Sequence, residues 1–495
     1  MAEESLKSKA VKGAAWSFAG NIANKGIQFV ISLLLARMLT PADYGLIGMM
    51  GFFIGIASSF IDSGFSSALI QYKDRQNKDY CTVFYVNFGM SILMYGILYV
   101  TAPFIAEFYN QPTLINIIRV YCLTFLIGAF STINSITLTI NLNYKLSNII
   151  NTTSALISGI IGLICAYRNM GVWSLIVQQL SAAIIRMVLL LYKVRWFPKL
   201  EFSVASFRRF FSYGSKLLVS GLIHTAYSNM YPMIIGKEFS ASDLGYVSRA
   251  QGFNEMAGGT IVGILGSIAF PVLTRVQDDD KTLMRLYEKY IQISAFVVFP
   301  LILFLAGIAK PLILLLLTDK WAPSIILLQI LSLGYIWDGI IRINLNLLYV
   351  KGRTDLVLRL EVIKKTIAFL IMAATVLIGD LIIMCAGMTI YGTIALYLNT
   401  IYTKKLLNLG FLKQMKQIWP YLCASLLICA IALIFSWTIS NNLISLLVST
   451  LVCVPLYILL CYKSRLYALR EIVYMVAPKA GKIGEWMLSK MTISN

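Results

Sequence analysis

The stretch Gly20–Leu39, GNIANKGIQFVISLLLARML, has an apolar second half that fits a membrane-spanning helix and a polar first half. The polar residues of the stretch are spaced at i, i+3, i+4, i+7 and i+11, which puts them on one face of a helix. They are Asn21, Asn24, Lys25, Gln28 and Ser32. Because a charged group inside a bilayer costs about 2.5 kcal/mol or more, Lys25 needs a polar environment.

Two interpretations of this polar stripe remain open. It is either a hydrogen-bonded seam between packed helices or the wall of a water-filled cavity, since lipid would leave its polar groups unsatisfied. No acidic residue lies within the helical turn of Lys25, and a snorkelling lysine normally sits nearer a helix end. Lys25 therefore favours the cavity.

The composition is that of an integral membrane protein. The chain has 495 residues, of which 58% are hydrophobic and 13% charged, and its mean hydropathy is +0.77. Soluble domains carry about 25% charged residues. The net charge of +20 does not indicate nucleic-acid binding, because the basic residues are scattered through short loops. The eight cysteines lack C-x-x-C spacing and are interpreted as packed thiols, and we expect neither a metal nor a cofactor.

Apolar runs of about 20 residues predict an all-α protein with about 14 transmembrane helices. The predicted spans are 14–38, 44–67, 81–103, 114–139, 147–168, 172–193, 213–236, 246–274, 288–308, 322–349, 356–378, 381–402, 419–438 and 443–462. The polar residues 1–13 are not followed by a cleavage site, so the first helix is expected to act as an uncleaved signal anchor.

The charges of the loops alternate along the chain. One set of loops, with both termini, holds 32 lysines and arginines, whereas the opposite set holds 7. Positive loops face the cytoplasm, so both termini are predicted to be cytoplasmic. No predicted external loop exceeds about 15 residues, which excludes an external catalytic or receptor domain.

A weak internal repeat has an offset of 200 residues. Leu35–Gly45, LARMLTPADYG, aligns with Ile235–Gly245, IGKEFSASDLG, and pairs Arg37 with Lys237. Six spans separate the copies, which predicts two six-helix lobes in a parallel repeat. The expected parts are an N-terminal lobe (1–212), a C-terminal lobe (213–402), two extra helices (403–463) and an amphipathic cytoplasmic tail on the inner leaflet (464–495).

Other polar residues lie within predicted spans. Candidate substrate contacts besides the stripe of helix 1 are His224, Tyr227, Arg249 and Arg342. Candidates for a gate or for ion coupling are Asp62, Glu255, Asp338, Arg37 and Lys237. His224, the only histidine, has three interpretations: a structural residue, a proton-coupling group or a substrate contact.

Asp338 and Arg342, at i and i+4, neutralise each other in the simplest interpretation. Deep basic groups, including Arg186, outnumber deep acids overall, which favours an anionic substrate.

Three segments resemble bacterial Wzx-type polysaccharide flippases of the colanic-acid exporter kind, in the multidrug/oligosaccharidyl-lipid/polysaccharide exporter superfamily. They are Leu6–Met49 (LKSKAVKGAAWSFAGNIANKGIQFVISLLLARMLTPADYGLIGM), Asp62–Gln71 (DSGFSSALIQ) and Ala269–Asp279 (AFPVLTRVQDD). The resemblance implies a central cationic cavity and alternating access. Lys25 matches a diphosphate-contacting lysine of related flippases, whereas helix 2 lacks a basic residue and His224 stands where a cation is expected.

The implied substrate is an oligosaccharide unit linked to undecaprenyl diphosphate or a similar lipid, moved from the inner to the outer leaflet of the bacterial inner membrane. A polysaccharide polymerase, a chain-length regulator and membrane lipids are the expected partners, and nucleic acid is not. The main alternative is an ion-coupled multidrug exporter. Such an exporter would place acidic residues deep in the first or the seventh predicted span (14–38 or 213–236). Three other classes of protein fit less well. A polysaccharide polymerase would need a large external loop, and a membrane O-acyltransferase would need a buried catalytic histidine in a context that His224 lacks. A scaffold protein would leave the polar stripe unexplained.

Overall fold

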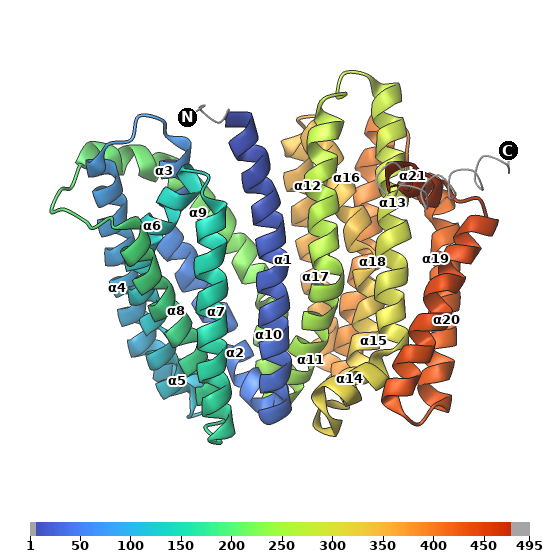
Figure 1. The fold of residues 1–495 in the computed structure, drawn as a ribbon, viewed down its shortest axis with the longest axis horizontal. Coiled ribbons are helices and arrows are strands. Elements are labelled where there is room, and N and C mark those ends of the chain that lie inside the picture. Colours follow the sequence, from blue (N-terminus) through green and yellow to red (C-terminus); the bar gives the residue numbers. More distant parts are fainter. Residues whose placement is uncertain (1–5, 477–495) are drawn as a thin grey trace. The chain divides into compact units, whose positions relative to one another are not determined.

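The computed structural model describes the backbone of residues 6–476 and the side chains of residues 20 and 23–471. Within this range every regular element is a helix, which confirms the expected all-α class (Figure 1). The chain divides into two compact units, Met1–Gly245 (unit 1) and Tyr246–Asn495 (unit 2).

Unit 1 is a bundle of long and short helices. They are α1 (Leu6–Met38), α2 (Pro41–Asp62), α3 (Phe65–Gln71), α4 (Asn77–Phe108), α5 (Leu114–Tyr121), α6 (Leu123–Ile140), α7 (Tyr144–Tyr167), α8 (Trp173–Val194), α9 (Val204–Ser228) and α10 (Met230–Glu238). Helix α7 packs against α1 and α8, and α6 packs against α4 and α8 (Figure 1). Helix α2 contacts α9 and α10.

Helix α11 (Ala241–Asn254) begins in unit 1 and continues into unit 2. The helices that follow it are η1 (Glu255–Gly259, a π-helical turn), α12 (Thr260–Thr274), α13 (Asp280–Gly307), α14 (Ala309–Leu317), η2 (Asp319–Trp321), α15 (Ser324–Tyr335), α16 (Asp338–Val350), α17 (Thr354–Ile378), α18 (Leu381–Leu407), α19 (Phe411–Thr438), α20 (Asn442–Lys463) and α21 (Tyr467–Val476). Helix α13 is central to this unit, because it packs against α12, α15, α16 and α19.

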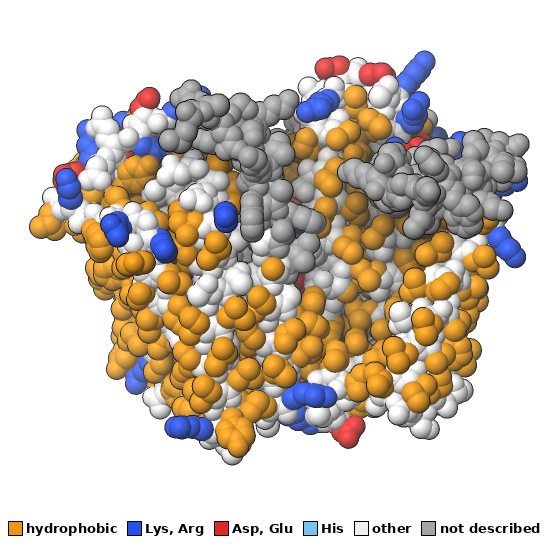
Figure 2. All heavy atoms as spheres, in the orientation of Figure 1, with side chains coloured by type: hydrophobic (Ala, Val, Ile, Leu, Met, Phe, Trp, Pro, Cys, Tyr) orange, Lys and Arg blue, Asp and Glu red, His pale blue; other side chains and the backbone are white. Residues whose placement is uncertain are grey.

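The exterior of each unit is suited to lipid. Large apolar side chains such as Val100, Phe104 and Leu451 are exposed. On the visible face, hydrophobic side chains cover the middle of each unit, and most charged groups lie near its ends (Figure 2). Eleven helical segments of the described part are long and apolar enough to cross a membrane. The protein is therefore a multi-pass membrane protein.

Three further predicted spans fall on helices that are not among those eleven. They are the spans on α1, on α9 with α10, and on α17. These helices carry polar groups such as Lys25, His224 and Lys364, and polar groups lower the mean hydropathy of a span. The count of fourteen spans stays a prediction.

The division of the chain into compact units falls at residue 245, whereas the predicted lobe boundary falls at residue 212. Helices α9 and α10 belong to unit 1 because they pack against α2. The lobe boundary rests on the sequence repeat rather than on compactness, so it remains a prediction.

Both copies of the 200-residue repeat build the same capping box. The Asp43 carboxylate accepts from the backbone and hydroxyl of Thr40, and the Thr40 hydroxyl accepts from the Asp43 amide. Ser240 and Asp243 make the same three bonds before α11. Two orphan amides at each helix start are thereby satisfied.

The starts of α2 and α11 also approach each other closely within unit 1. A Cβ on Gly45 would lie 1.6 Å from the carbonyl oxygen of Ala241, and a Cβ on Gly245 would lie 2.0 Å from that of Pro41. Both distances are far below contact distance, so only glycine fits at these repeat-related positions.

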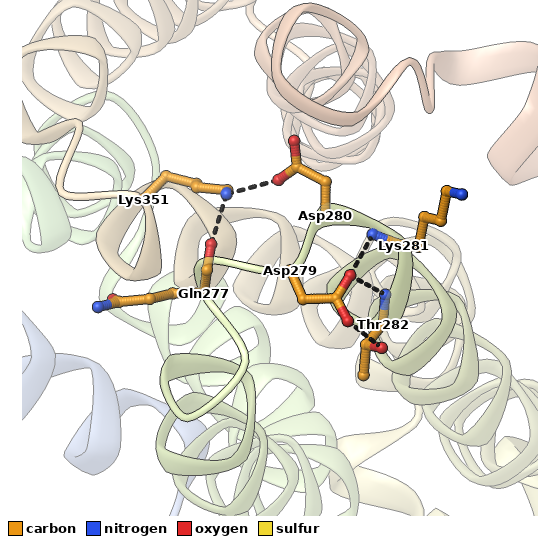
Figure 3. Close-up of polar contacts among 6 residues, drawn as sticks. All are labelled: Gln277, Asp279, Asp280, Lys281, Thr282 and Lys351. Atoms are coloured by element: carbon orange, nitrogen blue, oxygen red, sulfur yellow. Dashed lines mark hydrogen bonds and ion pairs between the residues drawn. The ribbon is translucent and has the colours of Figure 1, made fainter.

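Asp279 caps α13 in the loop that follows α12. It accepts hydrogen bonds from the amides of Lys281 and Thr282 and from the Thr282 hydroxyl (Figure 3). The hydroxyl and amide of Thr282 hold the pKa of Asp279 below its ordinary value. Next to this cap, Lys351 donates to the Gln277 carbonyl at 2.6 Å and to the Asp280 carboxylate at 2.7 Å (Figure 3). These contacts tie the end of α16 to the start of α13.

The expected amphipathic tail begins with α21, which is held on unit 2. The Ala468 amide donates to the Tyr421 hydroxyl at 3.1 Å, and Glu471 forms an ion pair with Lys289 of α13. The rest of the tail, from residue 477, lies outside the described residues.

Candidate functional site

A polar cavity of about 690 Å³ lies within unit 1, and we call it the N cavity. It is bounded by α1, α2, α7 and α8, with two residues from α5 and α6. Its polar lining residues are Asn24, Gln28, Ser32, Tyr44, Tyr121, Thr124, Asn151, Ser154, Ser158, Gln178, Gln179 and Arg186. Eleven of the nineteen lining residues thus carry an amide or a hydroxyl group, and the others except Arg186 are apolar.

Helix α1 lines the N cavity with Asn24, Gln28 and Ser32, which are spaced at i, i+4 and i+8. The Gln28 amide donates to the Asn24 side-chain oxygen at 3.3 Å, and the Tyr44 hydroxyl donates to the Ser32 carbonyl at 3.3 Å. This part of the polar stripe faces a cavity, as one of the two interpretations of the sequence predicted.

Another part of the N cavity wall comes from α7 and α8. Gln178 and Arg186 are two turns apart on one face of α8, with the small Ala182 between them. Arg186 is exposed to the cavity, and its guanidinium donates to the Ser135 hydroxyl at 3.2 Å. The spacing of Gln178 and Arg186 in the sequence already indicates that they share one face of a helix. Nothing in the sequence indicates that Asn151 of α7 lines the same cavity.

The other residues of the stripe are placed differently. Lys25 is exposed and is not among the lining residues of the N cavity. The Asn21 side chain lies outside the described residues. A role for either residue in substrate binding remains a prediction.

A second cavity, of about 530 Å³, lies in unit 2, and we call it the C cavity. Its polar lining residues are Gln251, Asn254, Glu255, Tyr335, Asp338, Lys364, Thr389 and Tyr391. They come from α11, η1 and α15 to α18. The two predicted coupling residues Glu255 and Asp338 thus lie in the same cavity.

The two carboxylates of the C cavity begin different helical elements, Glu255 the π-helical turn η1 and Asp338 the helix α16. Glu255 accepts a hydrogen bond from the Tyr335 hydroxyl at 2.5 Å. Lys364, which is buried, pairs with Glu361 one turn away on α17. Helical π-turns often occur at functional sites. The C cavity contains two carboxylates and one ammonium group, so its charge differs from that of the N cavity.

Two predicted basic contacts lie outside both sets of lining residues. The Arg249 guanidinium lies over the ring of the buried Trp321, 5.4 Å from its centroid. The side chain of Arg342 packs beside Gly266 of α12. Both residues belong to unit 2, whereas Lys25 belongs to unit 1.

The two predicted contacts on α9 are also outside the cavities. His224 is exposed and Tyr227 is half-buried. The neighbouring Thr225 hydroxyl forms a hydrogen bond with that of Ser59 on α2 at 3.0 Å. The face of α9 that is engaged within unit 1 therefore packs against α2.

The other three residues predicted for a gate or for ion coupling lie at helix ends. Arg37 is exposed in the last turn of α1, and Asp62 is the exposed last residue of α2. Lys237 donates to the Phe108 carbonyl at 2.7 Å and lies over the Phe108 ring. Lys237 thereby joins α10 to the end of α4. Across the described part of the chain, no cluster of three or more histidine, cysteine, aspartate or glutamate residues is placed to bind a metal ion.

The many lipid-facing helices and the polar cavities within the bundles define a membrane protein with the architecture of a transporter. The whole fold is similar to that of the lipid II flippase MurJ in an inward closed conformation. The TM-score is 0.72 at 13% identity, and the match covers 92% of this chain and 99% of that one.

The chain belongs to the family described as polysaccharide biosynthesis protein, whose profile matches residues 34–326. It is 24% identical to the teichuronic acid biosynthesis protein TuaB of Bacillus subtilis, over 71% of this chain and 73% of that protein. It is 23% identical to the lipopolysaccharide biosynthesis protein WzxC of Escherichia coli, over 84% and 85%.

Proposed function

We propose that the protein is a flippase for lipid-linked oligosaccharides in surface polysaccharide biosynthesis. It moves polyprenyl-diphosphate-linked repeat units from the inner to the outer leaflet of the bacterial cytoplasmic membrane, with both termini in the cytoplasm. The observation that carries the proposal is the N cavity, an amide- and hydroxyl-lined space within a MurJ-like fold. Such groups suit a saccharide, because they donate and accept hydrogen bonds like its hydroxyls.

In this proposal the transported unit is held by its polar part while its lipid tail stays in the bilayer. Lys25 contacts the diphosphate, since an exposed ammonium group on a membrane helix attracts a multivalent anion. Arg249, in unit 2, stays a predicted substrate contact. The two lobes alternate access to opposite leaflets, and the capped starts of α2 and α11 lie near the external gate.

The C cavity supplies the coupling. Glu255 and Asp338 line it together, and two carboxylates in one membrane-embedded cavity attract a cation or a proton. The protein is a transporter and not an enzyme in this proposal. A polymerase and a chain-length regulator act on the product at the outer leaflet.

The test is translocation of a polyprenyl-diphosphate-linked oligosaccharide in liposomes that contain the purified protein. Lys25→Ala should lower the initial rate about tenfold or more, because one charge-assisted contact with the diphosphate is lost. Lys73→Ala, at an exposed lysine between α3 and α4, is the matched control and should be close to wild type. Normal transport by Lys25→Ala at normal protein levels would exclude the assignment of Lys25. Lack of transport by the wild type would exclude the flippase.

One observation favours a second candidate, the ion-coupled multidrug exporter. The carboxylates of the C cavity would also attract a cationic organic compound. In the same liposomes an exporter would transport ethidium when an imposed ion gradient provides the driving force. Ethidium transport that is lost in Glu255→Gln, without any movement of the lipid-linked unit, would favour this candidate.

A further inference from the structure

Several amides of the N cavity are available to a ligand. Asn151, Gln178 and Gln179 line the cavity, and their side chains make no hydrogen bond to any described residue. Amides at membrane depth are costly unless water or a ligand satisfies them. The three groups come from α7 and α8 and line the same cavity as Asn24 and Gln28 of α1.

The N cavity also has a defined charge. Arg186 is the one charged group among its described lining residues, and none of these residues carries a carboxylate. Arg186 lies eight residues before the end of α8, about 12 Å along the helix axis. The Ser135 hydroxyl, its neutral partner, leaves most of the five guanidinium donors available. An arginine held this way is suited to an anion.

The number of positive charges in the N cavity indicates which kind of anion it binds. A planar guanidinium can bind either a carboxylate or a phosphate group through two parallel hydrogen bonds. Arg186 supplies a single positive charge, which balances one carboxylate but not the two or more negative charges of a diphosphate. The surrounding amides and the two tyrosines, Tyr44 and Tyr121, provide hydrogen bonds and ring faces for a sugar.

We propose that the N cavity binds an acidic sugar of the transported unit, with Arg186 on its carboxylate and the amides of α1, α7 and α8 on its hydroxyls. This inference rests on the proposed flippase function and adds the substrate class. The preference for a negatively charged saccharide is then located within unit 1 and is separate from recognition of the diphosphate.

The test compares two probes on the purified full-length protein in nanodiscs. One is a disaccharide that contains D-glucuronic acid, and the other is its neutral D-glucose counterpart. The wild type should bind the acidic probe about tenfold or more tightly than the neutral one. Arg186→Gln should bring the two affinities within about twofold of each other, by loss of the acidic probe alone. Arg119→Gln, at an arginine that stacks on Tyr99 outside the N cavity, should retain the preference.

Equal wild-type affinities would overturn the proposal even if the Arg186 variant failed to fold. Retention of the preference by a folded Arg186→Gln protein would also overturn it. Inorganic pyrophosphate is the third probe: if it displaces the acidic disaccharide competitively at micromolar concentration, the anion of this cavity is a diphosphate and the proposal fails.

The liposome assay separates this proposal from the function on which it rests. Acidic and neutral oligosaccharides on the same lipid diphosphate are compared there. Transport of both by wild type and Arg186→Gln at equal rates would refute the acidic-sugar site and leave the flippase intact. Transport of neither by the wild type would refute the flippase.

Discussion

At the scale of single residues, Gln414 is the centre of a buried polar network in unit 2. Its side-chain NH2 group has two hydrogens and lies within hydrogen-bonding distance of four acceptors. They are the Thr403 hydroxyl at 3.0 Å, the Asn344 side-chain oxygen at 3.1 Å, the Tyr287 hydroxyl and the Leu409 carbonyl. All these side chains are buried, so each bond replaces contact with water. Networks of this kind are stabilising only when every member is satisfied.

Gln414→Leu is expected to lower the free energy of unfolding by about 1–3 kcal/mol, because buried acceptors lose their donor. The measurement is denaturation of the purified protein in detergent. Gln417→Leu, three residues further along α19, is the control: this half-buried glutamine donates to the single acceptor Glu288, so its loss should be smaller. Equal losses in the two variants would contradict a central role for Gln414.

At the candidate site, local sequence patterns account for the placement of some side chains and not of others. The helical spacing of Asn24 and Gln28 was sufficient to put them on one face, and that face lines the N cavity. The sequence identifies Arg186 as a deep charge but does not indicate that it lines a cavity. Other lining residues, such as Asn151, come from α7, and spacing within one helix carries no information about another helix.

At the scale of elements, the starts of α2 and α11 are matched in sequence and in contact. Their capping boxes contain Thr40 with Asp43 and Ser240 with Asp243. Gly45 and Gly245 then allow each backbone to reach the other. The repeat that was read from the sequence therefore has a counterpart in paired local geometry.

Gly45→Ala is expected to lower the free energy of unfolding by about 1–3 kcal/mol, because the new methyl group would overlap the Ala241 carbonyl and force α2 and α11 apart. Gly89→Ala in α4 is the matched control. No atom lies within 4 Å of a Cβ at Gly89, so this change should be neutral or stabilising, as alanine favours a helix. The readout is the denaturation midpoint of both variants in detergent. A Gly45→Ala protein as stable as wild type would show that the close crossing is not maintained in solution.

At the scale of the whole molecule, the orientation follows from the charge of the loops. The cytoplasmic set is predicted to include the loop before α17, and the external set the loop after it. Helix α17 is one of the three predicted spans outside the eleven apolar segments, so it tests both the orientation and the number of spans.

Single cysteines on either side of α17 provide the measurement, in a variant that lacks the eight native cysteines. Asp380→Cys should react with a membrane-impermeant maleimide in intact spheroplasts, whereas Thr354→Cys should react only after permeabilisation. Native folding of the cysteine-free protein is checked first by its transport activity. Reaction of both positions from the outside would show that α17 does not span the membrane.

The sequence alone was enough to determine the membrane class, the helical fold and the repeat, because each depends on local patterns. Hydrophobic run length sets a span, loop charge predicts its orientation, and a capping box needs only four consecutive residues. The tertiary structure alone decided which polar groups share a cavity. It brought Arg186 of α8 and Asn151 of α7 to Asn24 of α1, and Glu255 to Asp338. The physical reason is that a cavity forms from the packing of helices far apart in sequence, and no single helix encodes that packing.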